Sequence, residues 1–337
     1  MTDLFVPRQL GTHIQKAVQE FPAVVVVGPR QSGKTTLLVN LFGGRYPIIS
    51  LEPPDIRLAA QSDPRGFLAL YPPPIIFDEV QYAPGLLPYI KERIDTDRNQ
   101  TGQFILTGSQ NLLLMSQVTE SLAGRTAVLK LMPLSLREAA WIPGENFPWE
   151  GDSTPRLPSI PPIELWNQIL RGSYPEPVVH PERDPRLWQS SYIQTYLERD
   201  VRNLRKLGDL TQFQVFLRAL AARSAQILNL SDLARDVGIA VNTAKDWLSI
   251  LEASFQIIIL RPYFANIGKR LIKSPKVYFA DTGLLCYLVG LKDAEHASAG
   301  PMGGAIFENL VVADLYKTFL HRGEEPALYF WRTTAGS

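Results

Sequence analysis

Gly28-Pro-Arg-Gln-Ser-Gly-Lys-Thr-Thr36 has the pattern G-x-x-x-x-G-K-T and directly follows the apolar run Ala23-Val-Val-Val-Val27. A β-branched run of this length predicts a buried strand of a parallel sheet. The residues after the glycine loop, Thr36-Leu-Leu-Val-Asn-Leu41, predict the start of a helix. Strand, glycine loop and helix in this order are typical of a phosphate-binding loop, because the backbone N–H groups and the helix N-terminus both favour an anion.

The loop residues have distinct expected roles toward a nucleoside triphosphate. Lys34 is expected to reach the β- and γ-phosphates, and the Thr35 hydroxyl is expected to hold Mg²⁺. The alternative is a chance glycine loop between a strand and a helix, which the spacing and the flanking segments disfavour. The predicted nucleotide-binding residues are Gly28, Pro29, Arg30, Gln31, Ser32, Gly33, Lys34, Thr35 and Thr36.

A second motif is an apolar strand that ends in two acidic residues, Pro74-Ile-Ile-Phe-Asp-Glu-Val-Gln81. The end of such a strand places Asp78 beside the phosphate loop, where it can hold Mg²⁺ through a water. Glu79 can then polarise the attacking water as a general base. The alternative is a pair of solvated carboxylates. The phosphate loop upstream favours the catalytic interpretation.

Two further stretches supply candidates for sensing the γ-phosphate. Gln103-Phe-Ile-Leu-Thr-Gly-Ser109 predicts a strand whose carboxyl end faces the ligand crevice, so Thr107 or Ser109 is a candidate. The alternative is that Ser109 caps the next helix. Arg125 precedes a predicted strand over 126–131 and is a candidate for stabilising γ-phosphate charge, on its own or a neighbouring subunit, although most arginines are simply solvated. A role on a neighbour predicts self-association.

Charge and cysteine content argue against several other kinds of function. The net charge of +1 gives no global attraction to nucleic acid or to an anionic membrane. The single cysteine, Cys286, excludes an internal disulfide and a cysteine-cluster metal site, which fits a reducing cytoplasm. The segment Met1-Thr-Asp-Leu4 lacks the features of a signal peptide, and no apolar run approaches the ~20 residues of a membrane helix. We therefore expect a cytoplasmic protein without a membrane contact.

The second half contains a helix-turn-helix pattern over Asn229–Leu251. Ser231 is expected to cap a short helix, Gly238 to form the turn, and 241–252 to form the second helix. The strand-like segments 255–263 and 276–280 would form the wing of a winged helix. The predicted organisation is an α/β domain over 1–141, a proline-rich linker or insertion over 142–162, a helical region over 163–211, a winged helix over 212–290 and an α/β element over 300–337.

The predicted wing is basic. Between Arg261 and Lys276 no acidic residue occurs, which suits contacts to the phosphates of double-stranded DNA. The predicted second helix, however, carries a single lysine, Lys245, beside Asp246, which is poor for reading bases. Winged helices also serve as protein-packing modules, so both kinds of partner stay open. The basic residues of the wing are Arg261, Lys269, Arg270, Lys273 and Lys276.

Together these motifs resemble a prokaryotic AAA+-type ATPase family that joins an N-terminal ATPase domain to a C-terminal domain of unknown function related to restriction-endonuclease folds. The resemblance implies ATP and Mg²⁺ as ligands and a P-loop parallel sheet with helices on both faces. It also implies a nuclease-like site whose later acidic and lysine positions this chain lacks. Only Glu308 of that set is present, so we expect a truncated element and no nuclease activity. The matching stretches include 28–37, 77–81, 106–109, 122–125, 172–175, 196–200, 273–283, 307–310 and 330–333.

Two functions compete. The first is an ATP hydrolase that couples nucleotide state to a winged helix contacting DNA or protein. The second is a nucleotide-gated interaction module with little turnover. Glu79 favours the first, because pure nucleotide binders often lack the base. No Asn-Lys-x-Asp guanine-reading motif occurs, so ATP is the default nucleotide.

Overall fold

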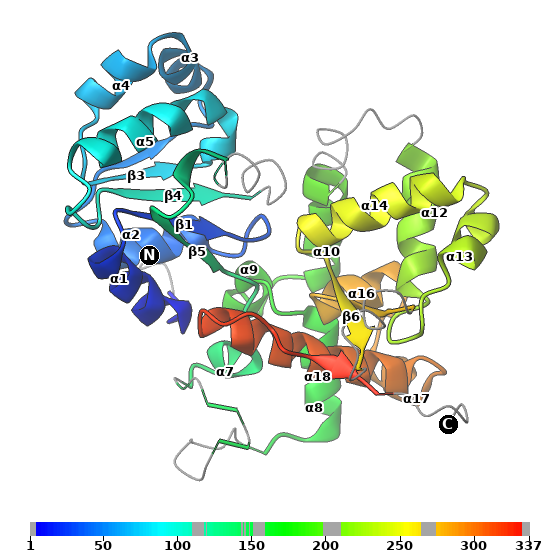
Figure 1. Ribbon diagram of the computed structural model, residues 1–337. Helices are drawn as coiled ribbons and strands as arrows, with labels where there is room; N and C mark the ends of the chain where they lie inside the picture. Colours follow the sequence, from blue (N-terminus) through cyan, green and yellow to red (C-terminus); the bar gives the residue numbers. More distant parts are fainter. Residues whose placement is uncertain are drawn as a thin grey trace. The chain divides into compact units, whose positions relative to one another are not determined.

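The computed structural model describes residues 5–109, 118, 120–142, 144, 146–147, 149–150, 159–197, 210–263 and 274–331. The chain divides into two compact units. The first contains residues 1–132 and 320–324, and the second contains residues 133–319 and 325–337. Figure 1 shows both units, with labels on many of their helices and strands, and the units are described separately below.

The first unit contains a five-stranded sheet in the order β2-β3-β4-β1-β5, and every neighbouring pair is parallel. This confirms the predicted parallel α/β architecture. The central strand β1 is entirely buried, as its run of four valines predicts. The strands are β1 Ala23–Val27, β2 Ile48–Ser50, β3 Ile75–Asp78, β4 Phe104–Gly108 and β5 Thr126–Lys130.

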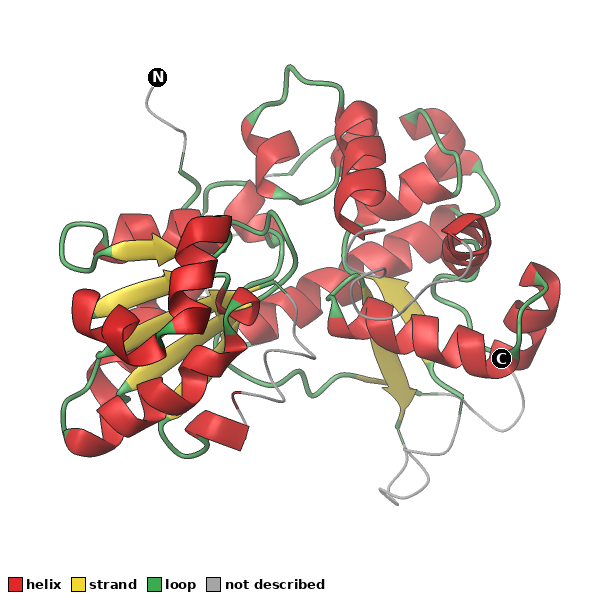
Figure 2. Ribbon diagram, turned by 90° about the horizontal axis from the view of Figure 1, so that it is seen from above, coloured by secondary structure: helices red, strands yellow, loops and turns green. Residues whose placement is uncertain are grey.

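Helices cover both faces of this sheet (Figure 1). On one face, α1 and α2 pack on alternate residues of β1, Val24 and Val26. On the other face, Phe67 of α4 lies 5.8 Å from the ring of Phe77, which stacks at 6.3 Å on Phe104. Figure 2 shows the strands from above with helices packed along them. The helices are α1 Leu10–Glu20, α2 Lys34–Phe42, α3 Pro54–Ser62, α4 Pro64–Leu70 and α5 Leu87–Thr96, with 3₁₀ turns η1 Val80–Tyr82 and η2 Pro84–Leu86.

The second unit is mostly helical. Its core joins aromatic and aliphatic residues that are distant in sequence, such as Tyr174, Phe213, Trp247 and Leu285. Its long helix α18 ends at His321, so the last two helical residues group with the first unit. The helices are α7 Leu136–Ala139, α8 Pro162–Arg171, α9 Pro175–Val179, α10 Pro185–Tyr192, the π-helix η3 Ile193–Leu197, α12 Leu210–Ala221, α13 Leu230–Val237, α14 Val241–Ala253, α16 Thr282–Leu288, α17 Ala294–Ala299 and α18 Gly303–His321.

A three-stranded sheet completes the second unit. Strand β6, Ile257–Pro262, pairs antiparallel with β7, Lys276–Phe279. Strand β8, Tyr329–Phe330, comes from the stretch expected to begin a separate α/β element, and it pairs in parallel with β6.

The helix-turn-helix pattern folds as α13 and α14, and Gly238 ends α13 with φ +75° in the left-handed region. The expected cap at Ser231 is wrong. The side chain of Asn229 accepts hydrogen bonds from the N–H groups of Ser231 and Asp232, because helix α13 begins two residues earlier than expected. None of the described helices is long and apolar enough to span a membrane.

Candidate functional site

The predicted phosphate-binding motif, residues 28–36, forms a loop over 28–33 that connects β1 to α2 at the carboxyl edge of the parallel sheet and continues into the first turn of α2. A Cβ atom on Gly28 would lie 2.0 Å from the backbone oxygen of Leu131, so only glycine fits at this position. Gly33 precedes α2 with φ +90°, a conformation that glycine adopts without strain. The two glycines of the motif therefore allow the sharp turn that directs the first N–H groups of α2 toward a ligand.

Polar groups converge on the inside of this loop. Lys34 is buried, and its Nζ donates to the carbonyl oxygens of Gly28 at 3.0 Å and Pro29 at 2.9 Å. The Ser32 hydroxyl is fully buried and has no hydrogen-bond partner among the described residues. A buried hydroxyl without a partner is unfavourable unless a ligand satisfies it. The loop thus has the charge and the hydrogen-bonding capacity that bound phosphates require.

A chain of hydrogen bonds joins the loop to the acidic strand end. The Thr35 hydroxyl donates to Asp78 Oδ2 at 3.0 Å, and the Thr107 hydroxyl donates to Asp78 Oδ1. The backbone N–H of Glu79 in turn donates to the Thr107 hydroxyl at 3.2 Å. Thr35 and Asp78 therefore present adjacent oxygen donors, which is the chemistry that Mg²⁺ prefers. These residues fit a Mg²⁺ ion that is bound together with the phosphates of a nucleotide.

Glu79 adopts the left-handed conformation, with φ 56° and ψ 48°. Its carboxylate accepts hydrogen bonds at Oε2 from Ser109 Oγ at 3.1 Å and from Gln81 Nε2. A non-glycine residue in this conformation is strained, and such strain clusters at functional sites. The structure thus brings Lys34, Asp78, Glu79 and Ser109 to one edge of the sheet. Gln81 also lies within the second motif, but its residue type alone predicted no role for it.

Arg125 lies elsewhere. It immediately precedes β5, and β5 is parallel to β1 with Ala23 opposite Thr126. Arg125 is therefore at the amino edge of the sheet, about 15 Å along the strands from the loop. Its Nε and Nη2 donate to the two carboxylate oxygens of Asp95 at 2.6 and 3.0 Å. This bond lowers the pKa of Asp95 and raises that of Arg125. The expectation that Arg125 reaches the γ-phosphate of its own chain is wrong.

Arg8 is a residue of this site that the sequence analysis missed. It is buried, and its guanidinium donates to the carbonyl oxygens of Ser32 at 2.7 Å and Met132 at 2.6 Å. The N–H of Met132 donates to His321 Nε2 at 3.2 Å, so this ring nitrogen acts as an acceptor. Because the bonds of Arg8 span 24 and 124 residues, no local pattern could have revealed them.

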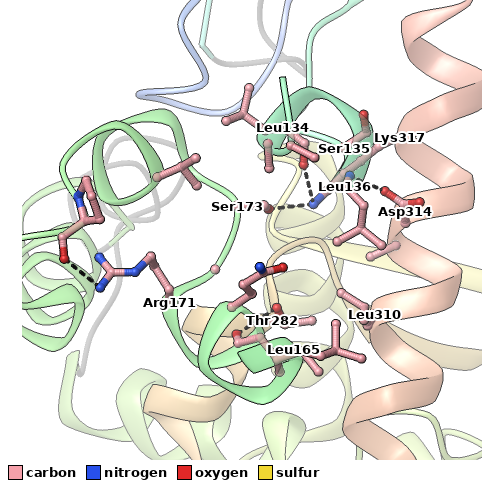
Figure 3. A pocket seen from close by; sticks show the side chains of 18 residues that line it. Leu134, Ser135, Leu136, Leu165, Arg171, Ser173, Thr282, Leu310, Asp314 and Lys317 are labelled. Carbon is pink, nitrogen blue, oxygen red and sulfur yellow. Dashed lines mark hydrogen bonds between the residues drawn. The ribbon is translucent and has the colours of Figure 1, made fainter. Parts of the chain in front are cut away.

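The second unit contains a cavity of about 280 Å³. Figure 3 shows Lys317 beside Ser173 and Leu134, and its Nζ donates to Ser173 Oγ at 2.7 Å and to the carbonyl oxygen of Leu134 at 3.3 Å. Arg171 and Asp314 also line the cavity. The walls of the cavity come from five helices, so no local sequence motif predicts it.

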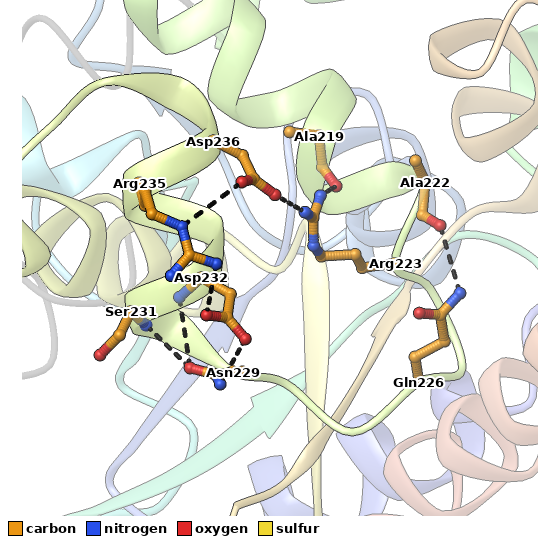
Figure 4. A network of polar contacts seen from close by, with 9 residues as sticks. All are labelled: Ala219, Ala222, Arg223, Gln226, Asn229, Ser231, Asp232, Arg235 and Asp236. Carbon is orange, nitrogen blue, oxygen red and sulfur yellow. Dashed lines mark hydrogen bonds and ion pairs between the residues drawn. The ribbon is translucent and has the colours of Figure 1, made fainter.

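Figure 4 shows that the charged side chains of α13 are paired, in part with Arg223, which follows α12. Arg223 contacts Asp236, and Arg235 Nη2 lies 2.8 Å from Asp232 Oδ1. On α14, Lys245 is exposed.

Of the five basic residues expected to contact DNA, Arg261 is exposed, and Lys276 lies 2.8 Å from Glu308 Oε1. The other three, Lys269, Arg270 and Lys273, lie outside the described residues. The hydroxyl of Tyr278 also donates to Glu308 at 2.6 Å. Burial and this carboxylate raise the pKa of Tyr278. Glu308, the acidic residue that the family resemblance associates with a nuclease-like site, is therefore bonded to a lysine and a tyrosine.

Comparison with known proteins agrees with this fold. Residues 20–140 match the model of an AAA domain, and residues 163–295 match a domain of unknown function, DUF8612. The Walker-type ATPase of Pyrococcus abyssi superimposes with a TM-score of 0.54 at 17% identity, covering 85% of this chain and 96% of that one. The fold and the loop make this chain a member of the AAA-type P-loop ATPase class.

Of three similar proteins, the two mycobacterial ones define the family. An uncharacterized protein of Mycobacterium tuberculosis is 31% identical over 331 residues, covering 97% of this chain and 68% of its own length, and a protein of Mycobacterium bovis gives the same values. An uncharacterized protein of Haemophilus influenzae is 24% identical over 252 residues, covering 72% of this chain and 57% of its own. The chain belongs to the family of the mycobacterial proteins. It combines an AAA domain with a separate C-terminal domain of unknown function.

Proposed function

We propose that this protein is a Mg²⁺-dependent ATP hydrolase that couples its nucleotide state to a C-terminal winged helix. The observation that carries the proposal is the hydrogen-bonded path from Thr35 through Asp78 and Thr107 to the backbone of Glu79. This path joins the loop that would hold the phosphates to the residue that would activate water. A binding protein without turnover has no need of a carboxylate held at that position.

Lys34 and each residue of the path have a role in the proposed reaction. Lys34 neutralises phosphate charge, while Thr35 and Asp78 would hold Mg²⁺. The ion supplies positive charge to the β- and γ-phosphates when it is bound. Glu79 accepts a proton from the attacking water as general base. Thr107 orients both Asp78 and the backbone of Glu79.

The second candidate is a nucleotide-gated protein-interaction module with little turnover. It is favoured by the charges in and beside the helix-turn-helix, because Arg235 and the preceding Arg223 are already paired with carboxylates of α13. A surface whose arginines are neutralised within the chain attracts a phosphate backbone weakly. We infer that a winged helix over 212–290 contacts either DNA through its wing or a protein through α14.

The decisive experiment is phosphate release by the purified protein, measured with MgATP, with and without double-stranded DNA. We expect release that requires Mg²⁺ and is lost in the Lys34→Ala variant. Tight ATP binding without phosphate release would instead support the nucleotide-gated module. Stimulation by DNA would favour DNA over protein as the partner.

A further inference from the structure

Glu79, the proposed general base, has a carboxylate that two neighbouring side chains hold by one oxygen. Ser109 Oγ donates to Oε2 at 3.1 Å, and Gln81 Nε2 donates to the same atom. Gln81 Nε2 also lies 3.3 Å from Ser109 Oγ, so the three side chains form a closed hydrogen-bonded triangle. Within the described part of the chain, every hydrogen bond to this carboxylate ends on Oε2. The other oxygen, Oε1, is therefore left to accept from a ligand or water.

The local backbone is what brings Gln81 to Glu79. In an extended strand, side chains two residues apart are separated by roughly 6.6 Å, which is too far for a hydrogen bond. Here Glu79 is in the left-handed conformation and the 3₁₀ turn Val80–Tyr82 follows directly. The turn folds the side chain of Gln81 back onto the carboxylate. The strained conformation of Glu79 is thus linked to its contact with Gln81.

Gln81 also has an oxygen that the protein leaves unsatisfied. Its Oε1 is buried and has no hydrogen-bond partner among the described residues. A buried amide oxygen without a donor is unfavourable, and a purely structural glutamine would normally have both ends satisfied. A water molecule has two hydrogens to donate. Glu79 Oε1 and Gln81 Oε1 are two acceptors that remain for them.

We propose that Gln81 is a positioning residue for ATP hydrolysis, which holds Glu79 Oε2 through its amide N–H and accepts the second hydrogen of the attacking water. This inference rests on the hydrolase function proposed above. In the step, the water oxygen bonds to the γ-phosphorus while the bond to the β–γ bridging oxygen breaks. One water proton passes to Glu79 and ADP leaves with the electron pair. Gln81 exchanges no proton and acts only by orientation.

The test compares Gln81→Met with Gln61→Met as a matched control. Gln61 donates to the carbonyl oxygen of Tyr82 at 2.8 Å, so it contacts the same 3₁₀ turn without touching Glu79. In Gln81→Met we expect kcat to fall about ten- to hundredfold, because Glu79 and the attacking water are no longer held in line with the γ-phosphate. KM for ATP and the affinity for a non-hydrolysable ATP analogue should stay within about twofold, because positioning acts on the water and not on the bound nucleotide. Gln61→Met should keep the wild-type kcat.

Each outcome decides between interpretations. If the wild type releases no phosphate, the hydrolase proposal fails and this inference falls with it. If the wild type hydrolyses ATP and Gln81→Met matches it, the inference alone fails. An increase in kcat would show that Gln81 restrains the base, and a parallel loss of nucleotide affinity would show a structural role; either result overturns the proposal. If thermal unfolding shows that Gln81→Met is not folded, Gln81→Asn replaces it. This variant keeps the amide on a shorter side chain, and the same changes in kcat and nucleotide affinity are expected.

Discussion

The guanidinium of Arg8 donates a hydrogen bond of 2.7 Å to the backbone carbonyl oxygen of Ser32, in the middle of the P-loop. A second bond of 2.6 Å runs from the same side chain to the carbonyl oxygen of Met132. The turn of the loop therefore depends on a residue that lies before helix α1, which itself precedes β1. A buried cation that bonds two carbonyl groups fixes the loop before any nucleotide arrives.

Replacing Arg8 by methionine should weaken nucleotide binding and stability together. Two buried carbonyl groups lose charge-assisted hydrogen bonds, at a cost of about 2–3 kcal/mol in the free energy of unfolding. The matched control is Arg57→Met, since Arg57 donates at 2.6 Å to the carbonyl oxygen of Glu52, away from the loop. Titration with a fluorescent ATP analogue and urea unfolding measure both effects. Equal affinities for the two variants would contradict a role of Arg8 in shaping the loop.

Lys34→Ala and Glu79→Gln should separate binding from chemistry. Lys34 acts on the phosphates of the bound nucleotide, so its removal should abolish binding. Glu79 acts on the water, so Glu79→Gln should bind ATP normally and lose about 10²–10⁴-fold in kcat. Binding by calorimetry and phosphate release give the two quantities. A Glu79→Gln protein that hydrolyses ATP at the wild-type rate would refute the assignment of the base.

The ion pair of Arg125 and Asp95 predicts a dependence of stability on pH. Because Arg125 lowers the pKa of Asp95 in the folded protein, the pair stabilises the fold above the ordinary carboxylate pKa of about 4. This contribution is lost as the pH falls through the lower, folded-state pKa. Asp95→Asn should therefore unfold at a lower temperature than the wild type at pH 7, and the difference should vanish in strong acid. A difference that persists there would indicate an effect other than charge.

A role for Arg125 at a neighbouring subunit makes a separate prediction. Arg125→Met should then lose turnover and ATP-dependent self-association, whereas Asp95→Asn, which keeps the guanidinium, should keep both. Light scattering with a non-hydrolysable ATP analogue gives the mass. A strict monomer, with Arg125→Met at full activity, would leave Arg125 with its structural ion pair alone.

Cys286 should be unreactive in the folded protein. Burial, together with the nearby carboxylate of Asp281, raises the pKa of this thiol to about 12. At pH 8 the thiolate is then rarer than in an exposed cysteine by about three orders of magnitude. Labelling with a chromogenic disulfide should be slow in buffer and reach one equivalent in denaturant, where the single cysteine is unfolded. Rapid stoichiometric labelling in buffer would contradict the buried position.

The parts that were predictable from sequence are those with local causes. Four consecutive valines, a glycine loop and an acidic strand end are each contiguous, so they predicted the parallel sheet and the edge where Lys34 and Asp78 meet. Arg125 was misplaced because its position depends on which strand pairs with β1 and in which register. Arg8 and Gln81 were missed for different reasons. Arg8 bonds to a residue 124 positions away in the sequence. Gln81 contacts Glu79 through a left-handed backbone conformation that the residue types do not predict.

The last prediction concerns DNA and the predicted wing. Its basic residues need only charge and reach to contact phosphates, so binding should be weak, salt-sensitive and independent of sequence. If about four side chains each neutralise a phosphate, the slope of log affinity against log salt should be roughly −3 to −4. Replacing Lys269, Arg270 and Lys273 together by alanine should flatten the slope by about two to three units.

Lys276 provides the internal control for this titration. Its Nζ lies 2.8 Å from Glu308 Oε1, so its charge is already compensated within the protein. Lys276→Ala should therefore change the slope by less than about one unit. Labelled duplex titrated at several salt concentrations measures all of these slopes. Absence of binding at low salt, or a slope that the triple substitution leaves unchanged, would exclude the wing as a nucleic-acid contact, and a protein would then be the better-supported partner of the helix-turn-helix.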